Sequence, residues 1–406
     1  MGSGRRVLYL DSYTVADPRR GVPSSDAIGY GITASGVIRN GLAARGWQVT
    51  CPKVAAVAES GSPRADRLRW ILHSYTAILD ELTRRPPDAV FCFHAFHAFP
   101  VEVRRMLLDL GLQVPIVGYT HGSHWDLTDT YRFDHYPGLD LADVANLRVL
   151  DRVLVVSPWM RDTLATGIAA LNPALADDIL GRVRVVGLPL DMATIDRHRT
   201  TEPFARTTVV FNHAPVRSKN PDLFATVMAD IMTRHPVDVL FTRRFRPEDP
   251  GGAAIAGLAR RYPGRVSLGN DLPLAEYYRA LWRSQLQVST ASHESLGVAT
   301  LEAMYTATCC VLPRVANYPA LCGNHPEVLY EPGPEGLRDR LVHLHQHKDI
   351  RINVGQELSR RTIQYGAQAI VGAIANVLDE IVEQGDMTGG NREEMDLAST
   401  LRFRRP

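Results

Sequence analysis

Short apolar runs that alternate with helix-length segments constrain the fold of this 406-residue chain more than any other feature. One series ends before residue 190, with runs at 5–10, 47–51, 88–93, 114–119, 152–156 and 182–187. A second series follows residue 205, with runs at 207–212, 237–242, 264–269, 285–290, 309–313 and 327–330. Continuous apolar runs separated by helices are typical of parallel sheets in doubly wound α/β folds. The sequence therefore predicts two such domains in tandem.

The boundary between the two predicted domains lies within 188–206, where the chain is polar and rich in turn formers. Residues 1–190 are expected to form the N-terminal domain, and residues 205–350 the C-terminal domain. Residues 351–384 are expected to form helices that pack back on the N-terminal domain. The remaining segment, 385–406, is polar and glycine-rich, and we expect a mobile tail.

Composition excludes several classes of protein. Lys and Arg total 45 against 44 Asp and Glu, and this balance disfavours a general nucleic-acid binder. The five cysteines form no C-x-x-C pair, which disfavours a zinc ribbon or a disulfide framework. No apolar run reaches the roughly 18 residues that cross a bilayer. We therefore expect a cytoplasmic enzyme without membrane insertion.

The most informative motif runs from Glu294 to Glu302, between a predicted strand and a predicted helix. The amide groups of Ser295, Leu296 and Gly297 would have no partner inside that helix, and such helix ends attract phosphate. Glu294 can accept hydrogen bonds from sugar hydroxyls, and Glu302 can accept both hydroxyls of a ribose. The alternative is a pair of acidic residues placed near a helix start by the helix dipole alone.

Two cations lie in the loop after the predicted strand 207–212. Asn212 ends that strand, Arg217 and Lys219 follow in the loop, and Pro221 suits the first turn of the next helix. Cations in such a loop can bind an anionic group of a ligand. For Arg217, the alternative is an ordinary solvated cation.

Histidines follow two strands of the N-terminal series. His121 and His124 come after the run at 114–119, and they are candidate site residues or plain structural histidines. A metal pair completed by Asp126 is the competing interpretation, although a third well-spaced ligand is not evident. His94 and His97 follow the run at 88–93, and they either line the acceptor side or belong to the core.

Gly29 and Gly31 lie in the first loop, where the absence of a third glycine argues against a dinucleotide fingerprint. They can let the backbone approach the donor phosphates or the acceptor, or they can form a flexible turn.

The Glu294–Glu302 motif resembles the E-x7-E signature of family 4 glycosyltransferases, which have the GT-B fold of two Rossmann-like domains facing across a cleft. Segments 29–49, 184–191 and 266–282 are also similar to that family. The Asn-His pair at 212–213, the Lys-Asn-Pro at 219–221 and the Asn-Tyr-Pro at 317–319 are similar to its tRNA-queuosine mannosyltransferase-like branch. That branch carries an arginine where this chain has Ala214.

The resemblance implies a hexosyltransferase-type enzyme (EC 2.4) that takes sugar from a GDP- or UDP-linked donor. The donor is expected on the C-terminal domain, and a small-molecule acceptor, such as a specialised metabolite, on the N-terminal domain. His121 would lie over the reacting sugar, and its neighbour His124 would contact the acceptor. Asn212 would bind the donor, and Lys219 and Arg217 would neutralise the leaving diphosphate. The resemblance further implies retention of configuration with no cofactor and no obligatory metal. The missing Asp-x-Asp triplet agrees with a metal-free leaving-group site.

Three other functions stay open on the sequence. Near-neutral charge disfavours tRNA as the acceptor only mildly. A nucleotide-sugar epimerase can share the two-domain architecture, and an inactive nucleotide-sugar-binding protein would explain the Ala214 departure. The expected partners are therefore a nucleotide sugar and a small molecule, with a homodimer left open.

Overall fold

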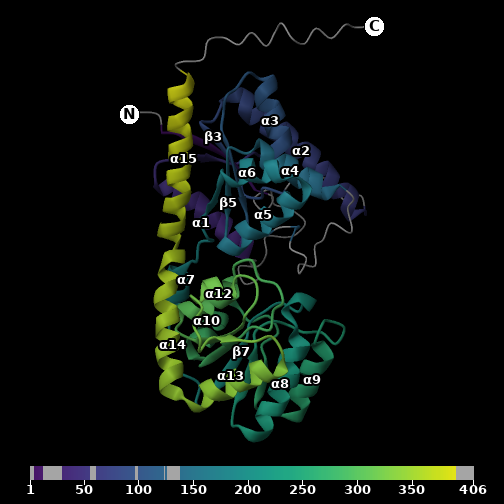
Figure 1. The fold of residues 1–406 in the computed structure, drawn as a ribbon, viewed down its shortest axis with the longest axis vertical. Coiled ribbons are helices and arrows are strands. Elements are labelled where there is room, and N and C mark those ends of the chain that lie inside the picture. The colour runs from purple at the N-terminus through teal and green to yellow at the C-terminus, as the bar shows by residue number, and fades with distance from the viewer. Residues whose placement is uncertain are drawn as a thin grey trace.

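The computed structural model describes residues 4–11, 30–54, 61–96, 99–122, 124–125 and 138–389 (Figure 1). Each predicted apolar run coincides with a strand, and β4 extends one residue past its run. The N-terminal strands are β1 (Arg6–Leu10), β2 (Gln48–Thr50), β3 (Ala89–Cys92), β4 (Ile116–Thr120), β5 (Arg152–Val155) and β6 (Val183–Val185). The C-terminal strands are β7 (Thr208–Phe211), β8 (Asp238–Phe241), β9 (Val266–Leu268), β10 (Leu286–Val288), β11 (Cys309–Pro313) and β12 (Leu329–Tyr330).

Helices connect the strands in both domains. Those of the N-terminal half are α1 (Tyr30–Ala44), α2 (Pro63–Arg84), α3 (Phe99–Asp109), α4 (Leu139–Val149), α5 (Pro158–Leu171), α6 (Pro173–Leu180) and α7 (Met192–Arg197). Those of the C-terminal half are α8 (Pro221–Arg234), α9 (Gly252–Arg261), α10 (Leu274–Arg283), α11 (Val298–Tyr305), α12 (Tyr318–Leu321), α13 (Pro334–Gln346), α14 (Lys348–Arg361) and α15 (Ala367–Gly389). Two 3₁₀ turns complete the set, η2 (Arg217–Lys219) and η3 (Thr362–Tyr365).

Both sheets are six-stranded and parallel, as the apolar runs predict. The N-terminal order is β2-β1-β3-β4-β5-β6, and the C-terminal order is β12-β11-β10-β7-β8-β9. In the second sheet the direction of winding reverses between β7 and β10, where Leu286 lies opposite Val209. Open parallel sheets bind ligands beyond the carboxyl ends of their strands at such a switch point. The sheet order thus points to the loops after β7 and β10.

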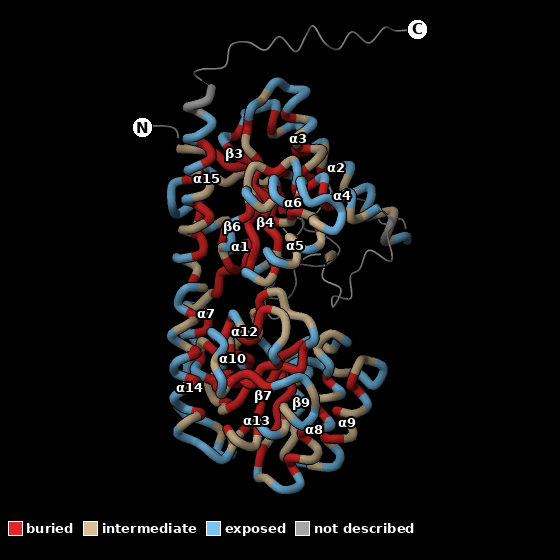
Figure 2. The backbone as a smooth tube through the Cα atoms, in the orientation of Figure 1, coloured by how far each residue is buried: buried red, intermediate tan, exposed pale blue. Residues whose placement is uncertain are grey.

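Burial explains why these segments form strands. Every residue of β1 and β11 is buried, whereas the edge strands β2 and β9 have no fully buried residue. Figure 2 shows the buried residues concentrated in the middle of each domain. Strands covered by helices on both faces need apolar side chains on both faces, so central strands are read from sequence as unbroken apolar runs.

The C-terminal helix joins the two halves of the molecule. Helix α14 belongs to the C-terminal domain, and α15 runs back along the N-terminal domain (Figure 1). A Cβ added to Gly41 of α1 would lie 2.7 Å from Val371 of α15, so a glycine is needed where the two helices approach. Arg5 adds an ion pair to Asp379 at 2.7 Å. The helix continues to Gly389, five residues beyond the predicted end at 384, and the rest of the predicted tail lies outside the described residues.

None of the described helices is both long enough and apolar enough to cross a bilayer.

Candidate functional site

The two loops at the switch point of the C-terminal sheet are joined by an ion pair. Lys219, at the end of η2 after β7, donates from Nζ to Glu294 Oε2 at 2.9 Å and to the His293 carbonyl at 3.1 Å. Both charged side chains are mostly buried, with 16% and 14% of their surface exposed. Tyr318 of α12 also donates to the same carboxylate oxygen, at 3.3 Å. The structure thus brings together two residues predicted from separate motifs.

The charge on Glu294 is stabilised by this arrangement. Burial alone would raise the pKa of the carboxyl, but Lys219 and His213 oppose it, and the net pKa lies below its ordinary value. Glu294 is therefore ionised at neutral pH, and Lys219 is held as a fixed cation beside it.

Unpaired amide groups follow Glu294. Among the described residues, the backbone N–H groups of Ser295, Leu296 and Gly297 donate no hydrogen bond. The carbonyls of this stretch are all bonded: Ser295 O accepts from Ser157 at 2.6 Å, Leu296 O accepts from Asn317 at 3.2 Å, and Gly297 O accepts from the Leu301 amide at 2.8 Å. Unpaired amides ahead of a helix are donors suited to an anion, as the sequence predicts.

Gly297 has a φ of +95° and precedes α11, and a Cβ there would lie 3.3 Å from Glu294 Cγ. Gly297→Ala is therefore expected to destabilise the protein by about 1–2 kcal/mol, because L-residues are strained in the left-handed region. Gly36→Ala is the control: it lies inside α1 with no atom near the added Cβ, and should stabilise slightly. Thermal unfolding measures both, and an unchanged midpoint in Gly297→Ala would contradict the geometry.

Glu302 is clamped by two tyrosines of α10. Its Oε2 accepts from Tyr277 at 2.6 Å, and its Oε1 accepts from Tyr278 at 3.1 Å. Burial raises the pKa of Glu302, against the two hydrogen bonds and the charge of Arg243. Each carboxylate oxygen retains a lone pair for one further donor, so the clamp orients the carboxylate without saturating it.

Asn212 and His213 lie beneath this edge. Asn212 is 2% exposed, and its amide donates to Tyr277 at 3.1 Å and to the Ala299 carbonyl at 2.8 Å. Gln287 of β10 lies 3.1 Å from His213 Nε2. The side-chain amide of Asn212 therefore bonds within the C-terminal domain, to a tyrosine that orients Glu302 and to the first turn of α11.

His213 is expected to make the protein sensitive to acid. Burial lowers its pKa to about 3, well below the unfolded value near 6.5, so the unfolded chain binds the extra proton first. Its contribution to stability is complete above pH 6.5 and is lost as the pH falls toward 3. The expected loss is at most about 1.4 kcal/mol per pH unit.

Urea unfolding at pH 7, 6 and 5 measures this effect. His213→Asn should flatten the pH dependence, whereas the exposed His73 gives a control variant, His73→Asn, that should leave it steep. An equal slope in His213→Asn and in the wild type would refute the assignment.

The N-terminal domain faces these loops with its own histidines. His121 follows β4, its carbonyl accepts from Ser295 Oγ at 2.8 Å, and its ring lies 4.9 Å from that of His94. Burial lowers the pKa of His121 to about 4, so it is neutral at pH 7. Two predicted histidines, from the ends of neighbouring strands, therefore meet, and the backbone of one of them bonds to Ser295.

His124 is held by a buried carboxylate. Its Nδ1 lies 2.5 Å from Asp143 Oδ2, and Asp143 of α4 is 1% exposed. Burial raises the pKa of Asp143 and His124 opposes it, with a net increase. Asp143 therefore fixes the orientation of the predicted acceptor-side histidine.

The remaining predicted residues are not assembled in the same way. Arg217 is exposed on η2, and its side chain has no hydrogen-bond or ion-pair partner in the described part of the chain. Gly31 lies in the first turn of α1. Gly29, His97 and Asp126 lie outside the described residues. Within the described ranges, no group of three His, Cys, Asp or Glu could hold a metal ion.

Sequence reasoning missed several residues that shape the site: Tyr277, Tyr278, His213, Arg243, Asn317, Asp143 and Ser157. His213 and the tyrosine pair on α10 lie within the segments that the sequence analysis compared with the family, but no role was assigned to them. Arg243 lies in no such segment, because only the pairing of β7 with β8 brings it near Glu302.

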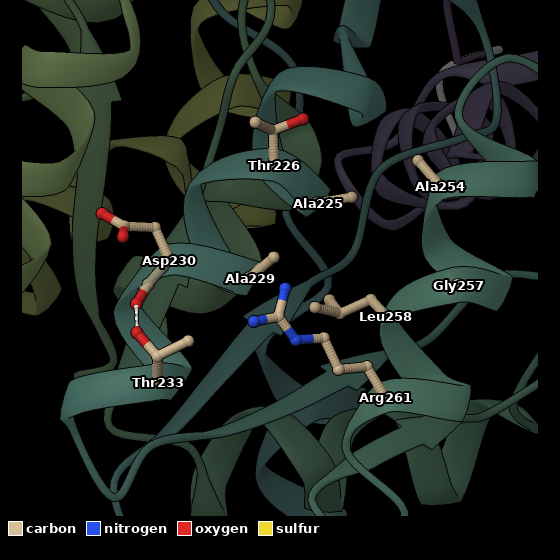
Figure 3. A pocket seen from close by; sticks show the side chains of 9 residues that line it. All are labelled: Ala225, Thr226, Ala229, Asp230, Thr233, Ala254, Gly257, Leu258 and Arg261. Carbon is tan, nitrogen blue, oxygen red and sulfur yellow. Dashed lines mark hydrogen bonds between the residues drawn. The ribbon is translucent and has the colours of Figure 1, made fainter.

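A cavity of about 510 Å³ lies elsewhere, on the outer side of the C-terminal domain (Figure 3). It lies between α8 and α9, and Arg261 points into it beside Ala229 and Leu258. No predicted site residue lines it. The chemistry-bearing residues gather instead where the two domains meet.

No protein-family model matches the chain, and no curated protein matches it. Solved structures do. A sucrose-phosphate synthase from Thermosynechococcus elongatus has a TM-score of 0.70 at 15% identity, covering 94% of this chain and 100% of the other. An α,α-trehalose 6-phosphate synthase from Burkholderia multivorans gives 0.68 at 11%, covering 97% and 100%.

A Listeria monocytogenes protein described as a UDP-N-acetylglucosamine 2-epimerase gives a TM-score of 0.57 at 11% identity, covering 94% of this chain and 97% of the other. These similarities extend over both domains. The prediction of two doubly wound α/β domains is therefore confirmed: the chain has the GT-B fold.

Proposed function

We propose that this protein is a GT-B glycosyltransferase that moves a sugar from a GDP- or UDP-linked donor to a small-molecule acceptor. One observation carries the proposal. Lys219, the 295–297 amides and the clamped Glu302 share the switch-point edge of the C-terminal sheet, and His121 of the other domain bonds to Ser295 there, with His94 beside its ring. A cation, free amides and an oriented carboxylate are the groups that a diphosphate and a ribose require.

The residues divide the work as follows. Lys219 and the free amides offset the charge that develops on the leaving diphosphate, with Arg217 adding a mobile cation from the surface. Glu302 accepts the ribose hydroxyls. Glu294, ionised beside Lys219, accepts from a sugar hydroxyl, and neutral His121 lies over the sugar.

Family 4 membership, retention of configuration and independence from metal are part of this proposal. Support comes from the E-x7-E motif and from the fold, which is shared with a trehalose-6-phosphate synthase whose structure was solved in a study of transfer with retention. The similar sucrose-phosphate and trehalose-phosphate synthases make sugar phosphates an acceptor class to test alongside unphosphorylated metabolites.

The similarity to the Listeria monocytogenes structure supports a nucleotide-sugar epimerase as the second candidate function. An epimerase needs a nucleotide sugar but no acceptor. A product assay separates the two. UDP- and GDP-sugars are incubated with and without a panel of sugar phosphates, unphosphorylated metabolites and tRNA. The proposal predicts release of nucleoside diphosphate that depends on one small-molecule acceptor. A sugar changed without any acceptor would establish the epimerase instead, and transfer to tRNA alone would replace the acceptor class.

A further inference from the structure

Ser157 is a buried hydroxyl that bonds to both domains. It follows β5, is 1% exposed, and caps α5 by accepting from the Met160 amide at 3.1 Å. The same Oγ lies 2.6 Å from the carbonyl oxygen of Ser295 in the C-terminal domain. A hydroxyl has one hydrogen and two lone pairs, so it donates to Ser295 while it accepts from Met160.

Ser295 is bonded to the N-terminal domain a second time. Its own hydroxyl donates to the His121 carbonyl at 2.8 Å. His121 and Ser157 follow β4 and β5, which are neighbours in the N-terminal sheet. Ser295 therefore spans the carboxyl ends of two adjacent strands of the opposite domain.

These bonds fix the direction of the free amides. In a trans peptide the C=O and N–H groups point in opposite directions within one plane. Because Ser157 holds the Ser295 carbonyl, the N–H of Leu296 must point away from α5. Asn317 holds the Leu296 carbonyl in the same way, at 3.2 Å, and so sets the N–H of Gly297.

We propose that Ser157 is a positioning residue for sugar transfer, which aims the Leu296 amide at the donor diphosphate when the two domains are together. The inference rests on the proposed function. It ties an anion-binding group of one domain to the acceptor-side domain, so that full stabilisation of the leaving group requires both. Without the Ser157 hydroxyl, the Ser295 carbonyl loses the donor that holds it, and the peptide between Ser295 and Leu296 keeps only its flanking bonds to His121 and Asn317. The direction of its N–H is then less restricted.

The test compares three variants. Ser157→Ala removes both the cap and the bond between domains, and Ser157→Thr keeps the hydroxyl. Asn172→Ala is the matched control, because Asn172 caps the neighbouring α6 through the Ala174 amide at 3.0 Å and makes no hydrogen bond to the described residues of the other domain. We expect Ser157→Ala to lower kcat about five- to tenfold with a smaller change in KM. Ser157→Thr should restore kcat, and Asn172→Ala should leave it unchanged.

Amide hydrogen exchange of Asn317 and Leu301 in the ligand-free protein provides the second measurement, because their N–H groups donate to the carbonyls of Glu294 and Gly297 on either side of the held peptide. Exchange there should accelerate in Ser157→Ala and not in Ser157→Thr or Asn172→Ala. Exchange and kcat in Ser157→Ala equal to those of Asn172→Ala would overturn the positioning role. If the wild type transfers no sugar, the proposed function fails, and the exchange experiment alone decides whether Ser157 holds the peptide.

Discussion

Lys219→Met is expected to lower kcat by about 100-fold or more, the loss typical of removing a principal donor to a developing negative charge. Lys219 is the predicted cation that the structure places at the switch point, held 2.9 Å from Glu294. In the proposed mechanism, the leaving diphosphate develops its charge beside Lys219. The exposed Arg217 has no ion pair among the described residues that would hold it in place. Turnover is measured at saturating donor, with Lys348→Met, an exposed lysine of α14, as the control.

Loss of stability must be separated from loss of catalysis in this experiment. Lys219→Met leaves a mostly buried carboxylate without its cation, which destabilises the fold. The double variant Lys219→Met/Glu294→Gln removes both charges and should recover the unfolding midpoint while kcat stays low. Near wild-type turnover in a folded Lys219→Met protein would remove Lys219 from the mechanism.

Glu302→Ala is expected to weaken nucleotide binding about 10- to 100-fold, the range for lost hydrogen bonds to a charged group. The tyrosine hydroxyls at 2.6 and 3.1 Å would also lose their acceptor, so the site loses its orientation as well as its charge. Tyr278→Phe removes one side of the clamp and should cost about fivefold. Isothermal titration with UDP and GDP measures the affinities.

Glu276→Ala is the matched control for this carboxylate, because Glu276 is exposed on α10 beside the clamping tyrosines. It should bind nucleotide like the wild type. An unchanged affinity in Glu302→Ala would show that the carboxylate serves the core of the C-terminal domain rather than a ribose.

The fold was predictable because a strand that is buried on both faces requires consecutive apolar residues. Central strands such as β1 and β11 are buried along their whole length, and their sequences are largely apolar runs. No comparable sequence pattern indicates the order of the strands in each sheet. The placement of β7 beside β10 had to come from the structure, and it is this pairing that brings Lys219 to Glu294.

The site was predictable in part, for a related reason. Glu294, Gly297 and Glu302 lie on one continuous strand-to-helix segment, so local sequence shows that they act together. Tyr278 and Asp143 support predicted residues from other elements, 24 and 19 positions away in the chain. Ser157 reaches Ser295 across 138 positions, and its sequence context shows only a helix cap. Such long-range partners are set by packing, and a sequence pattern does not reveal them.

Above all, we propose that the C-terminal domain binds a nucleoside diphosphate at the Glu294–Glu302 segment. Titrating the wild-type protein with UDP, GDP, ADP and dTDP, in EDTA and then in magnesium, tests it most directly. We predict that one nucleotide binds, that EDTA leaves its affinity unchanged, and that a 100-fold excess over its Kd raises the apparent stability by about 2.7 kcal/mol. Binding of none of the four, under either condition, would contradict it.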